Sequence, residues 1–147
     1  MANGFSSGGG RLGAVFVPLQ TSSTATQLGP IVAETAPRIF TASLESLDTA
    51  VEVLIDTPSV ERLVVFDYTS DDDAQRERYQ TATERLAAAG RDIAVVPLAD
   101  DLPAGLGLPK TPANVPPPDE NPLATLIYTS GSTGAPKGAM YTADMMT

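Results

Sequence analysis

The sequence of 147 residues contains no cysteine and no histidine. Without cysteine the chain can form no disulfide bond and has no thiolate to use as a nucleophile. Without histidine it has no imidazole for binding a metal ion or for general base catalysis. These absences leave hydroxyl groups, carboxylates and a small number of cationic side chains as the groups that could carry chemistry.

Positive charge and long apolar runs are also scarce. The formal net charge is −9, which argues against nucleic acid or an anionic membrane surface as a partner. No apolar run approaches the length of a membrane span, and residues 1–5 lack the basic and apolar regions of a signal peptide. We therefore expect a soluble, cytoplasmic protein. Lys110 and Lys137 are its only lysines.

Residues 129–138 combine hydroxyl groups, glycines and one of these lysines in the order Thr-Ser-Gly-Ser-Thr-Gly-Ala-Pro-Lys-Gly, directly after the apolar run 123–128. Glycines let the backbone curl so that successive N–H groups point into one concavity, where an anion can bind. Serine and threonine hydroxyls add hydrogen-bond donors, and Lys137 adds a full positive charge. The segment therefore predicts a polyphosphate-binding site.

The segment is not the P-loop of the Walker nucleotide hydrolases. That motif requires Gly-x-x-x-x-Gly-Lys-Ser/Thr, with the second glycine immediately before the lysine. Counted from Gly131, the second glycine position is occupied by Pro136, and Gly138 stands where the hydroxyl that binds Mg²⁺ should be. A different nucleotide chemistry is indicated.

The sequence Tyr-Thr-Ser-Gly-Ser-Thr-Gly-Ala-Pro-Lys-Gly at 128–138 resembles the phosphate loop of the adenylate-forming enzymes, the AMP-binding or acyl-CoA synthetase superfamily. Gly-Ala-Val-Phe-Val-Pro-Leu-Gln-Thr-Ser at 13–22, Leu-Val-Val-Phe-Asp at 63–67 and Ala-Met-Tyr-Thr at 139–142 are similar to the adenylation domain of carboxylic acid reductases, also described as fatty-acyl-CoA ligases. The resemblance extends from about Gly13 to the C-terminus and implies a partial adenylation domain at 13–147.

The resemblance implies that this loop surrounds the β- and γ-phosphates of ATP. Hydroxyl-bearing residues would donate hydrogen bonds, glycines would permit the turn, and Lys137 would neutralise phosphate charge. The residues it assigns to ATP binding are Thr129, Ser130, Gly131, Ser132, Thr133, Gly134 and Lys137. It assigns no catalytic residue and no metal ligand within the chain. A glycine- and serine-rich surface turn or linker is the alternative, but a flexible linker has no need of the fixed Pro-Lys-Gly after so many hydroxyl groups.

The implied reaction joins a carboxylate to ATP and gives acyl-AMP and pyrophosphate, with Mg²⁺ bound to the nucleotide. The expected partners are ATP and a fatty or aromatic carboxylic acid. In a full-length carboxylic acid reductase, phosphopantetheine and NADPH would then serve transfer and reduction to an aldehyde, in carrier and reductase domains outside this sequence. We therefore expect this chain to be a fragment of such an enzyme and to be inactive by itself. Two alternatives stay open: an acyl-CoA synthetase of another subfamily, and a non-catalytic remnant.

Along the chain, short apolar runs alternate with helical periodicity. We expect strands at 14–17, 38–41, 63–66 and 93–96, and helices at 24–36, from a cap at Ser43 to about 55, and at 71–89. Asp71, Asp72 and Asp73 favour a helix N-terminus over a metal site, because consecutive carboxylates cannot all face one ion. Strands separated by helices predict an α/β fold with βαβ units and a mostly parallel sheet.

The two flanks of this pattern differ from it. Residues 1–12 predict a flexible tail, which is either a shortened beginning of the domain or an ordinary flexible terminus. Prolines concentrate in 97–122, which predicts an extended surface loop leading to the strand at 123–128. By resemblance, residues 139–141 form the returning strand of a phosphate-loop hairpin, in the large N-terminal domain of an adenylate-forming enzyme, and the last residues begin a helix.

Overall fold

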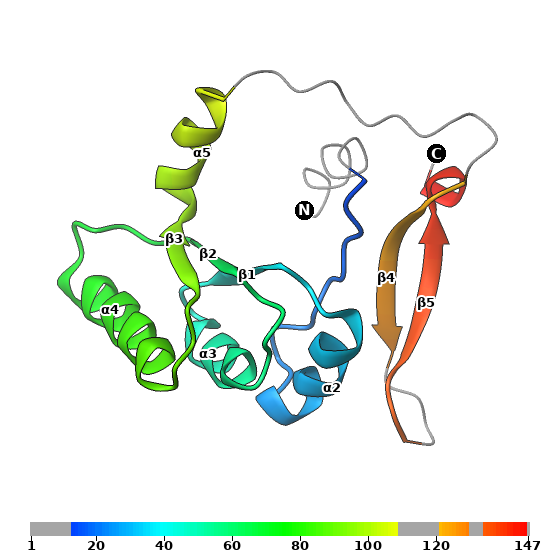
Figure 1. Ribbon diagram of the computed structural model, residues 1–147, viewed down its shortest axis with the longest axis horizontal. Helices are drawn as coiled ribbons and strands as arrows, with labels where there is room; N and C mark the ends of the chain where they lie inside the picture. Colours follow the sequence, from blue (N-terminus) through cyan, green and yellow to red (C-terminus); the bar gives the residue numbers. More distant parts are fainter. Residues whose placement is uncertain (1–12, 109–120, 130–133, 147) are drawn as a thin grey trace. The chain divides into compact units, whose positions relative to one another are not determined.

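The computed structural model describes residues 13–108, 121–129 and 134–146 (Figure 1). The chain divides into two units, each with its own set of contacts. The larger unit spans Thr21–Leu108, and the smaller one combines the described parts of 1–20 and 109–147. The predicted tail at 1–12 lies outside the described residues.

A three-stranded parallel sheet forms the centre of the larger unit (Figure 1). Its strands are β1 (Ile39–Ser43), β2 (Arg62–Phe66) and β3 (Ala94–Pro97), hydrogen-bonded in that order. Leu63, Val64 and Val65 are buried in succession, so β2 is covered on both faces. Coverage on both faces explains why β2 reads as a continuous apolar run, without alternation. The predicted α/β class is confirmed.

The helices α3 (Leu47–Ile55) and α4 (Asp73–Ala88) connect the strands and pack against each other. Each crossover runs from one parallel strand to the next, which makes two successive βαβ units. Burying one large aliphatic side chain contributes about 1.5–3 kcal/mol. The side chains that fill this core include Leu47, Val51, Leu54, Leu63, Val65, Ala82 and Leu86.

Helix starts show how local sequence sets the boundaries. The predicted helix at 24–36 is α2 (Ala25–Thr35), which begins after Thr24, whose backbone N–H donates to Gln27 Oε1 at 2.9 Å. The cap predicted at Ser43 is wrong, because Ser43 ends β1 and α3 begins after Ser46. The hydroxyl of Ser43 instead accepts a hydrogen bond from the backbone N–H of Ser46 at 3.2 Å.

Two predicted segments differ from the structure. The buried strand predicted at 14–17 is reduced to a single parallel bridge between Phe16 and Thr125, and Val15 is exposed. The loop predicted over 97–122 is wrong at its beginning, where α5 (Leu98–Leu106) forms a helix. Asp101 on α5 accepts a hydrogen bond from Arg62 at 2.6 Å, which ties α5 to β2. Residues 109–120 of the predicted loop lie outside the described residues.

The smaller unit contains an antiparallel hairpin of β4 (Leu123–Thr129) and β5 (Lys137–Thr142) (Figure 1). The predicted strands at 123–128 and 139–141 are confirmed, each with one or more additional residues at its ends. The backbone of Phe16 donates to Ala124 O at 3.0 Å and accepts from the N–H of Leu126 at 2.8 Å. The helix predicted at the end of the chain is a short 3₁₀ turn, η1 (Ala143–Met146).

Candidate functional site

The residues predicted to bind phosphate centre on the turn of the β4–β5 hairpin. Thr129 ends β4, Lys137 begins β5, and the two are paired directly across the hairpin. Gly134 belongs to the connection between the strands. Ser130, Gly131, Ser132 and Thr133 lie outside the described residues. Of the predicted site, the structure therefore places Thr129 and Lys137 together at the base of one loop.

Gly134 has a backbone conformation that suits glycine. Its φ is +128°, a region that side chains disfavour, and nothing lies within 4 Å of the position a Cβ would take. Gly134 is exposed, so the backbone conformation, and not crowding by neighbouring atoms, requires glycine at this position. A sharp change of chain direction immediately before Lys137 agrees with the predicted turn.

Lys137 projects from the hairpin with an exposed side chain. Among the described residues, the ion pairs use arginines, and no acidic side chain pairs with Lys137. Its positive charge is therefore not neutralised by a carboxylate of the described chain. In a protein of net charge −9, Lys137 thus places a positive charge beside exposed Thr129 at the base of the loop.

Gly138 follows Lys137 in β5 and was not among the predicted site residues. A Cβ at this position would lie 2.8 Å from Leu126 Cδ2 and 3.1 Å from Tyr128 Cζ. Tyr128 is paired directly across the hairpin from Gly138. The sequence placed Gly138 at the end of the phosphate-loop motif, but nothing in the motif indicates which side chains converge over it.

Asp71, Asp72 and Asp73 behave as the N-terminus of a helix. The carboxylate of Asp72 accepts a hydrogen bond from the backbone N–H of Gln75 at 3.1 Å and caps α4. Asp73 forms an ion pair with Arg76 one turn later. In the part of the chain that the structure describes, no cluster of acidic side chains is arranged to hold a metal ion.

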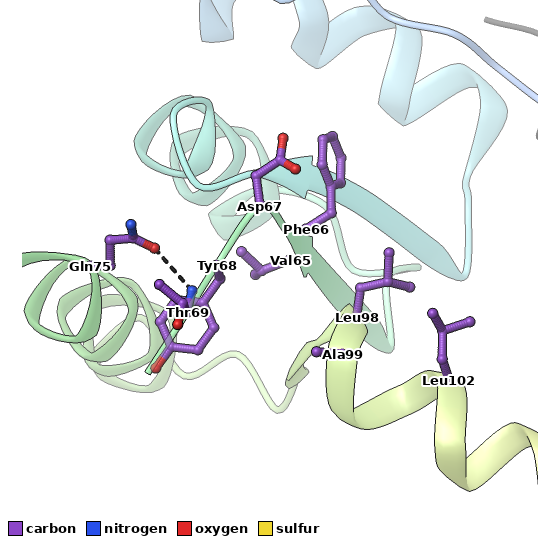
Figure 2. Close-up of a pocket in the computed structure, with 9 residues that line it drawn as sticks. All are labelled: Val65, Phe66, Asp67, Tyr68, Thr69, Gln75, Leu98, Ala99 and Leu102. Carbon is purple, nitrogen blue, oxygen red and sulfur yellow. Dashed lines mark hydrogen bonds between the residues drawn. The ribbon is translucent and has the colours of Figure 1, made fainter. Parts of the chain in front are cut away.

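A hollow of about 400 Å³ lies in the larger unit, between the end of β2 and α5 (Figure 2). Figure 2 shows Leu98, Ala99 and Leu102 from α5 on one side and Tyr68, Thr69 and Gln75 on the other. The backbone N–H of Thr69 already donates to Gln75 Oε1 at 3.0 Å. The hollow is mainly apolar and offers no cation, so the hairpin is the better candidate for binding a nucleotide.

No helix within 13–108, 121–129 and 134–146 has both the length and the apolar character needed to cross a bilayer.

The sequence matches a known family over almost its whole length. A family model described as AMP-binding enzyme matches residues 8–147. The chain belongs to this family of AMP-binding enzymes. The match includes the whole phosphate-loop segment and both structural units, so the predicted family is confirmed.

Two relatives with high identity to this chain are carboxylic acid reductases. The carboxylic acid reductase of Segniliparus rugosus is 49% identical over 132 residues, covering 88% of this chain and 11% of that protein. The carboxylic acid reductase of Mycobacterium tuberculosis is 50% identical over 131 residues, covering 89% of this chain and 11% of that protein. The chain thus spans about 11% of the length of these relatives.

Solved structures locate the likeness within the adenylation domain. The adenylation domain of the carboxylate reductase from Mycobacterium chelonae matches with a TM-score of 0.85 and 46% identity, over 94% of this chain and 21% of that one. The A domain of the Segniliparus rugosus enzyme, solved in complex with AMP and a co-purified carboxylic acid, matches with a TM-score of 0.81 and 44% identity. That match covers 92% of this chain and 21% of the domain. The predicted adenylation-domain fold is confirmed.

Proposed function

We propose that this chain forms the phosphate-binding part of an adenylation domain that activates a carboxylic acid with ATP, as part of a carboxylic acid reductase. The observation that carries the proposal is the hairpin base, where Lys137 is exposed, pairs with no carboxylate of the described residues, and stands opposite Thr129 in a member of the AMP-binding family. A related A domain binds AMP and a carboxylic acid, which supports ATP and an acid as the substrates. The resemblance to carboxylic acid reductases favours a fatty or aromatic acid as the acid substrate.

In the proposed reaction, a carboxylate oxygen attacks the α-phosphorus of ATP and forms the acyl–phosphate bond of acyl-AMP. The bond between the α-phosphorus and the bridging oxygen breaks, and pyrophosphate leaves with that oxygen. Lys137 and the hydroxyls of Thr129, Ser130, Ser132 and Thr133 stabilise negative charge on the leaving phosphates, and Gly131 and Gly134 allow the loop to surround them. Stabilising charge in this way is the main protein contribution in phosphoryl-type reactions.

Mg²⁺ would enter this site bound to ATP. The described residues provide hydroxyls and an ammonium group suited to phosphate oxygens, and they provide no carboxylate cluster suited to the metal ion. Phosphopantetheine and NADPH would act in carrier and reductase domains of a full-length enzyme. We propose a cytoplasmic location because ATP and NADPH are available there.

Chain coverage favours a carboxylic acid reductase over a CoA ligase. The sulfoacetate–CoA ligase of Cupriavidus necator is 42% identical, but over only 62 residues, or 40% of this chain. The anthranilate CoA ligase AuaEII shares the fold at 18% identity. The two enzyme classes differ in the thiol that accepts the acyl group. Aldehyde formation with NADPH would therefore distinguish them.

The test uses a chimera in which residues 13–147 replace the aligned segment of the Segniliparus rugosus enzyme. We expect the chimera to catalyse exchange of pyrophosphate into ATP with a fatty or aromatic acid, and to form the aldehyde with NADPH. Replacing Lys137 by alanine should lower kcat/KM for ATP by about tenfold to a hundredfold, the range for losing one charge-assisted hydrogen bond. The isolated chain should give negligible exchange.

The matched control is Lys110→Ala, which removes the other lysine of the chain. This variant should leave the rate of pyrophosphate exchange unchanged, although it lowers the net charge by the same amount as Lys137→Ala. Equal kcat/KM for ATP in the Lys137→Ala chimera and its parent would overturn the phosphate-binding role. The carrier and reductase domains must form the aldehyde when the parent segment is in place. If the chimera then catalyses pyrophosphate exchange but forms no aldehyde, the result favours a CoA ligase.

A further inference from the structure

Gly138 is crowded by side chains, unlike the other glycines whose surroundings the structure describes. An added Cβ would meet nothing within 4 Å at Gly29, Gly90, Gly105 or Gly134, and at Gly107 only a carbonyl oxygen at 3.6 Å. At Gly138 it would lie 2.8 Å from Leu126 Cδ2 and 3.1 Å from Tyr128 Cζ. Real Cβ atoms do not approach neighbours as closely as 2.8 Å, so the end of the Leu126 side chain would have to shift, and the Tyr128 ring would have to give by a few tenths of an ångström.

The backbone does not require glycine at this position. Among the described glycines, positive φ angles occur at Gly13, Gly90 and Gly134, and not at Gly138. Gly138 lies within β5, where glycine weakens a strand relative to other residues. The absence of a side chain at Gly138 therefore serves the packing of the residues above it.

The hairpin register explains which side chains these are. Tyr128 faces Gly138 directly, and Leu126 faces Met140 two residues further along β5. Because side chains alternate along a strand, Leu126 and Tyr128 project on the same face as Gly138. Both side chains are partly buried, and they converge on the space that a Cβ would fill. An aromatic ring that covers a cross-strand glycine is a known device for pinning strand register.

This pair lies one step from the proposed phosphate site. Thr129 and Lys137 form the next pair of the hairpin, and their side chains alternate to the opposite face. Any movement of the Tyr128 ring or of the β5 backbone at Gly138 therefore displaces Lys137, the neighbouring residue of β5. A displacement of a few tenths of an ångström matters there, because charge-assisted hydrogen bonds depend on distance and direction.

We propose that Gly138 and Tyr128 are positioning residues for the phosphate loop, with the ring of Tyr128 packed over the bare backbone of Gly138 and holding Lys137 and Thr129 in register at the loop base. This inference rests on the proposed function of the hairpin. It adds two residues that touch no phosphate themselves and act through the geometry of their neighbours.

The experiment measures pyrophosphate exchange in the chimera described above, with separate KM values for ATP and for the carboxylic acid. Gly138→Ala should raise KM for ATP by about fivefold, as expected for a modest packing strain passed to one binding residue. KM for the acid should stay within about twofold of the parent, because the change is confined to the phosphate end. In a Leu126→Ala background the nearest clash is gone, and Gly138→Ala should then raise KM for ATP by less than about twofold.

The matched control is Gly29→Ala, the same substitution on α2 where an added Cβ meets open space. It should change neither KM value. If Gly138→Ala lowers kcat or the yield of folded protein while KM for ATP stays unchanged, Gly138 is merely structural and the inference is overturned. The inference is also overturned if Gly138→Ala raises KM for ATP as much in the Leu126→Ala background as in the parent.

Failure of the inference and failure of the proposed function give different results. If Lys137→Ala raises KM for ATP and Gly138→Ala does not, the loop binds phosphate and the positioning role alone is wrong. If neither variant changes kcat/KM for ATP, the phosphate-binding role itself is overturned, and the positioning role is overturned with it.

Discussion

Tyr79 connects α4 to the edge strand β3 through its hydroxyl group. Its Oη donates to the backbone carbonyl of Val95 at 2.7 Å, and its ring stacks on Tyr68 with 4.7 Å between ring centroids. Burial raises the pKa of Tyr79, with smaller contributions from Tyr68 and Asp100. The folded state thus favours the protonated phenol, which is also the form that can donate to Val95.

Replacing Tyr79 by phenylalanine should lower the free energy of unfolding by about 1 kcal/mol, the usual net value of one hydrogen bond. Because the pKa is raised on folding, this stabilisation is complete below the ordinary tyrosine pKa of about 10 and is lost as the pH rises through the folded value. Urea denaturation followed by circular dichroism, at neutral pH and above about pH 10, measures both effects.

The control for this prediction is Tyr141→Phe, which removes a hydroxyl from an exposed position on β5. It should leave stability within about 0.5 kcal/mol of the parent, as is usual for surface substitutions. A Tyr79→Phe protein that is as stable as the parent at neutral pH, or that loses stability equally steeply at high pH, would contradict the account.

At the scale of elements, α4 shows how one side chain can decide where a helix begins. Asp72 has an extended backbone conformation, and its carboxylate accepts from the N–H of Gln75. The first N–H groups of a helix have no partner within it, and a cap satisfies one of them. The carboxylate also lies at the positive end of the helix dipole.

Asp72→Ala should therefore reduce the free energy of unfolding by about 1 kcal/mol, the typical cost of losing an N-cap. Asp71→Ala is the control, since it removes a carboxylate one residue earlier that does not cap the helix. Thermal unfolding of both variants, together with hydrogen exchange at the first turn of α4, provides the measurement. Equal destabilisation by the two substitutions would indicate general charge effects and not a cap.

Elements whose signals are local could be predicted from the sequence. The start of α4 needed only the aspartates that suit a helix N-terminus, and β2 needed only its continuous apolar run. The Pro-rich stretch misled because proline usually interrupts a helix, yet α5 contains Pro103. What holds α5 against β2 includes the Arg62–Asp101 ion pair, which joins residues far apart in the chain. No local pattern reveals such a contact.

Residues 14–17 show the same limit for strands. Their apolar character predicted a strand, but strand formation depends on a partner, and Phe16 alone bridges to Thr125. At the candidate site, the motif and its resemblance predicted a hairpin with Lys137 beside the turn. The packing over Gly138 could not be predicted, because a glycine gives no sign of which side chains occupy the space it leaves.

At the scale of the whole molecule, the described chain exposes several large apolar side chains. On α5, Leu102 is 60% exposed and Leu106 is 87% exposed, and Leu108 just beyond the helix is 68% exposed. Leu102 and Leu106 are four residues apart, so they lie on the same face of α5. Adjacent exposed leucines on a helix favour association with another apolar surface.

The isolated chain should therefore self-associate as its concentration rises. Leu102→Glu combined with Leu106→Glu should raise the concentration needed for association by about tenfold or more, since each buried leucine contributes about 1.5–3 kcal/mol. Sedimentation velocity over a series of concentrations measures the change. Ala104→Glu, which adds a charge to the same helix at an exposed non-leucine position, is the control. Association that is equally strong in the double variant would assign it to another surface.

The bridge from Phe16 to β4 has a consequence for synthesis on the ribosome. Residues 21–108 form a continuous unit and can begin to fold as soon as they emerge, but Phe16 must wait for Thr125. Contacts between positions so far apart in the sequence form slowly, because bringing them together costs chain entropy. The pairing of β4 with Phe16 is thus a late step, and a pause in translation after residue 108 would leave Phe16 without its neighbour while the larger unit begins to fold.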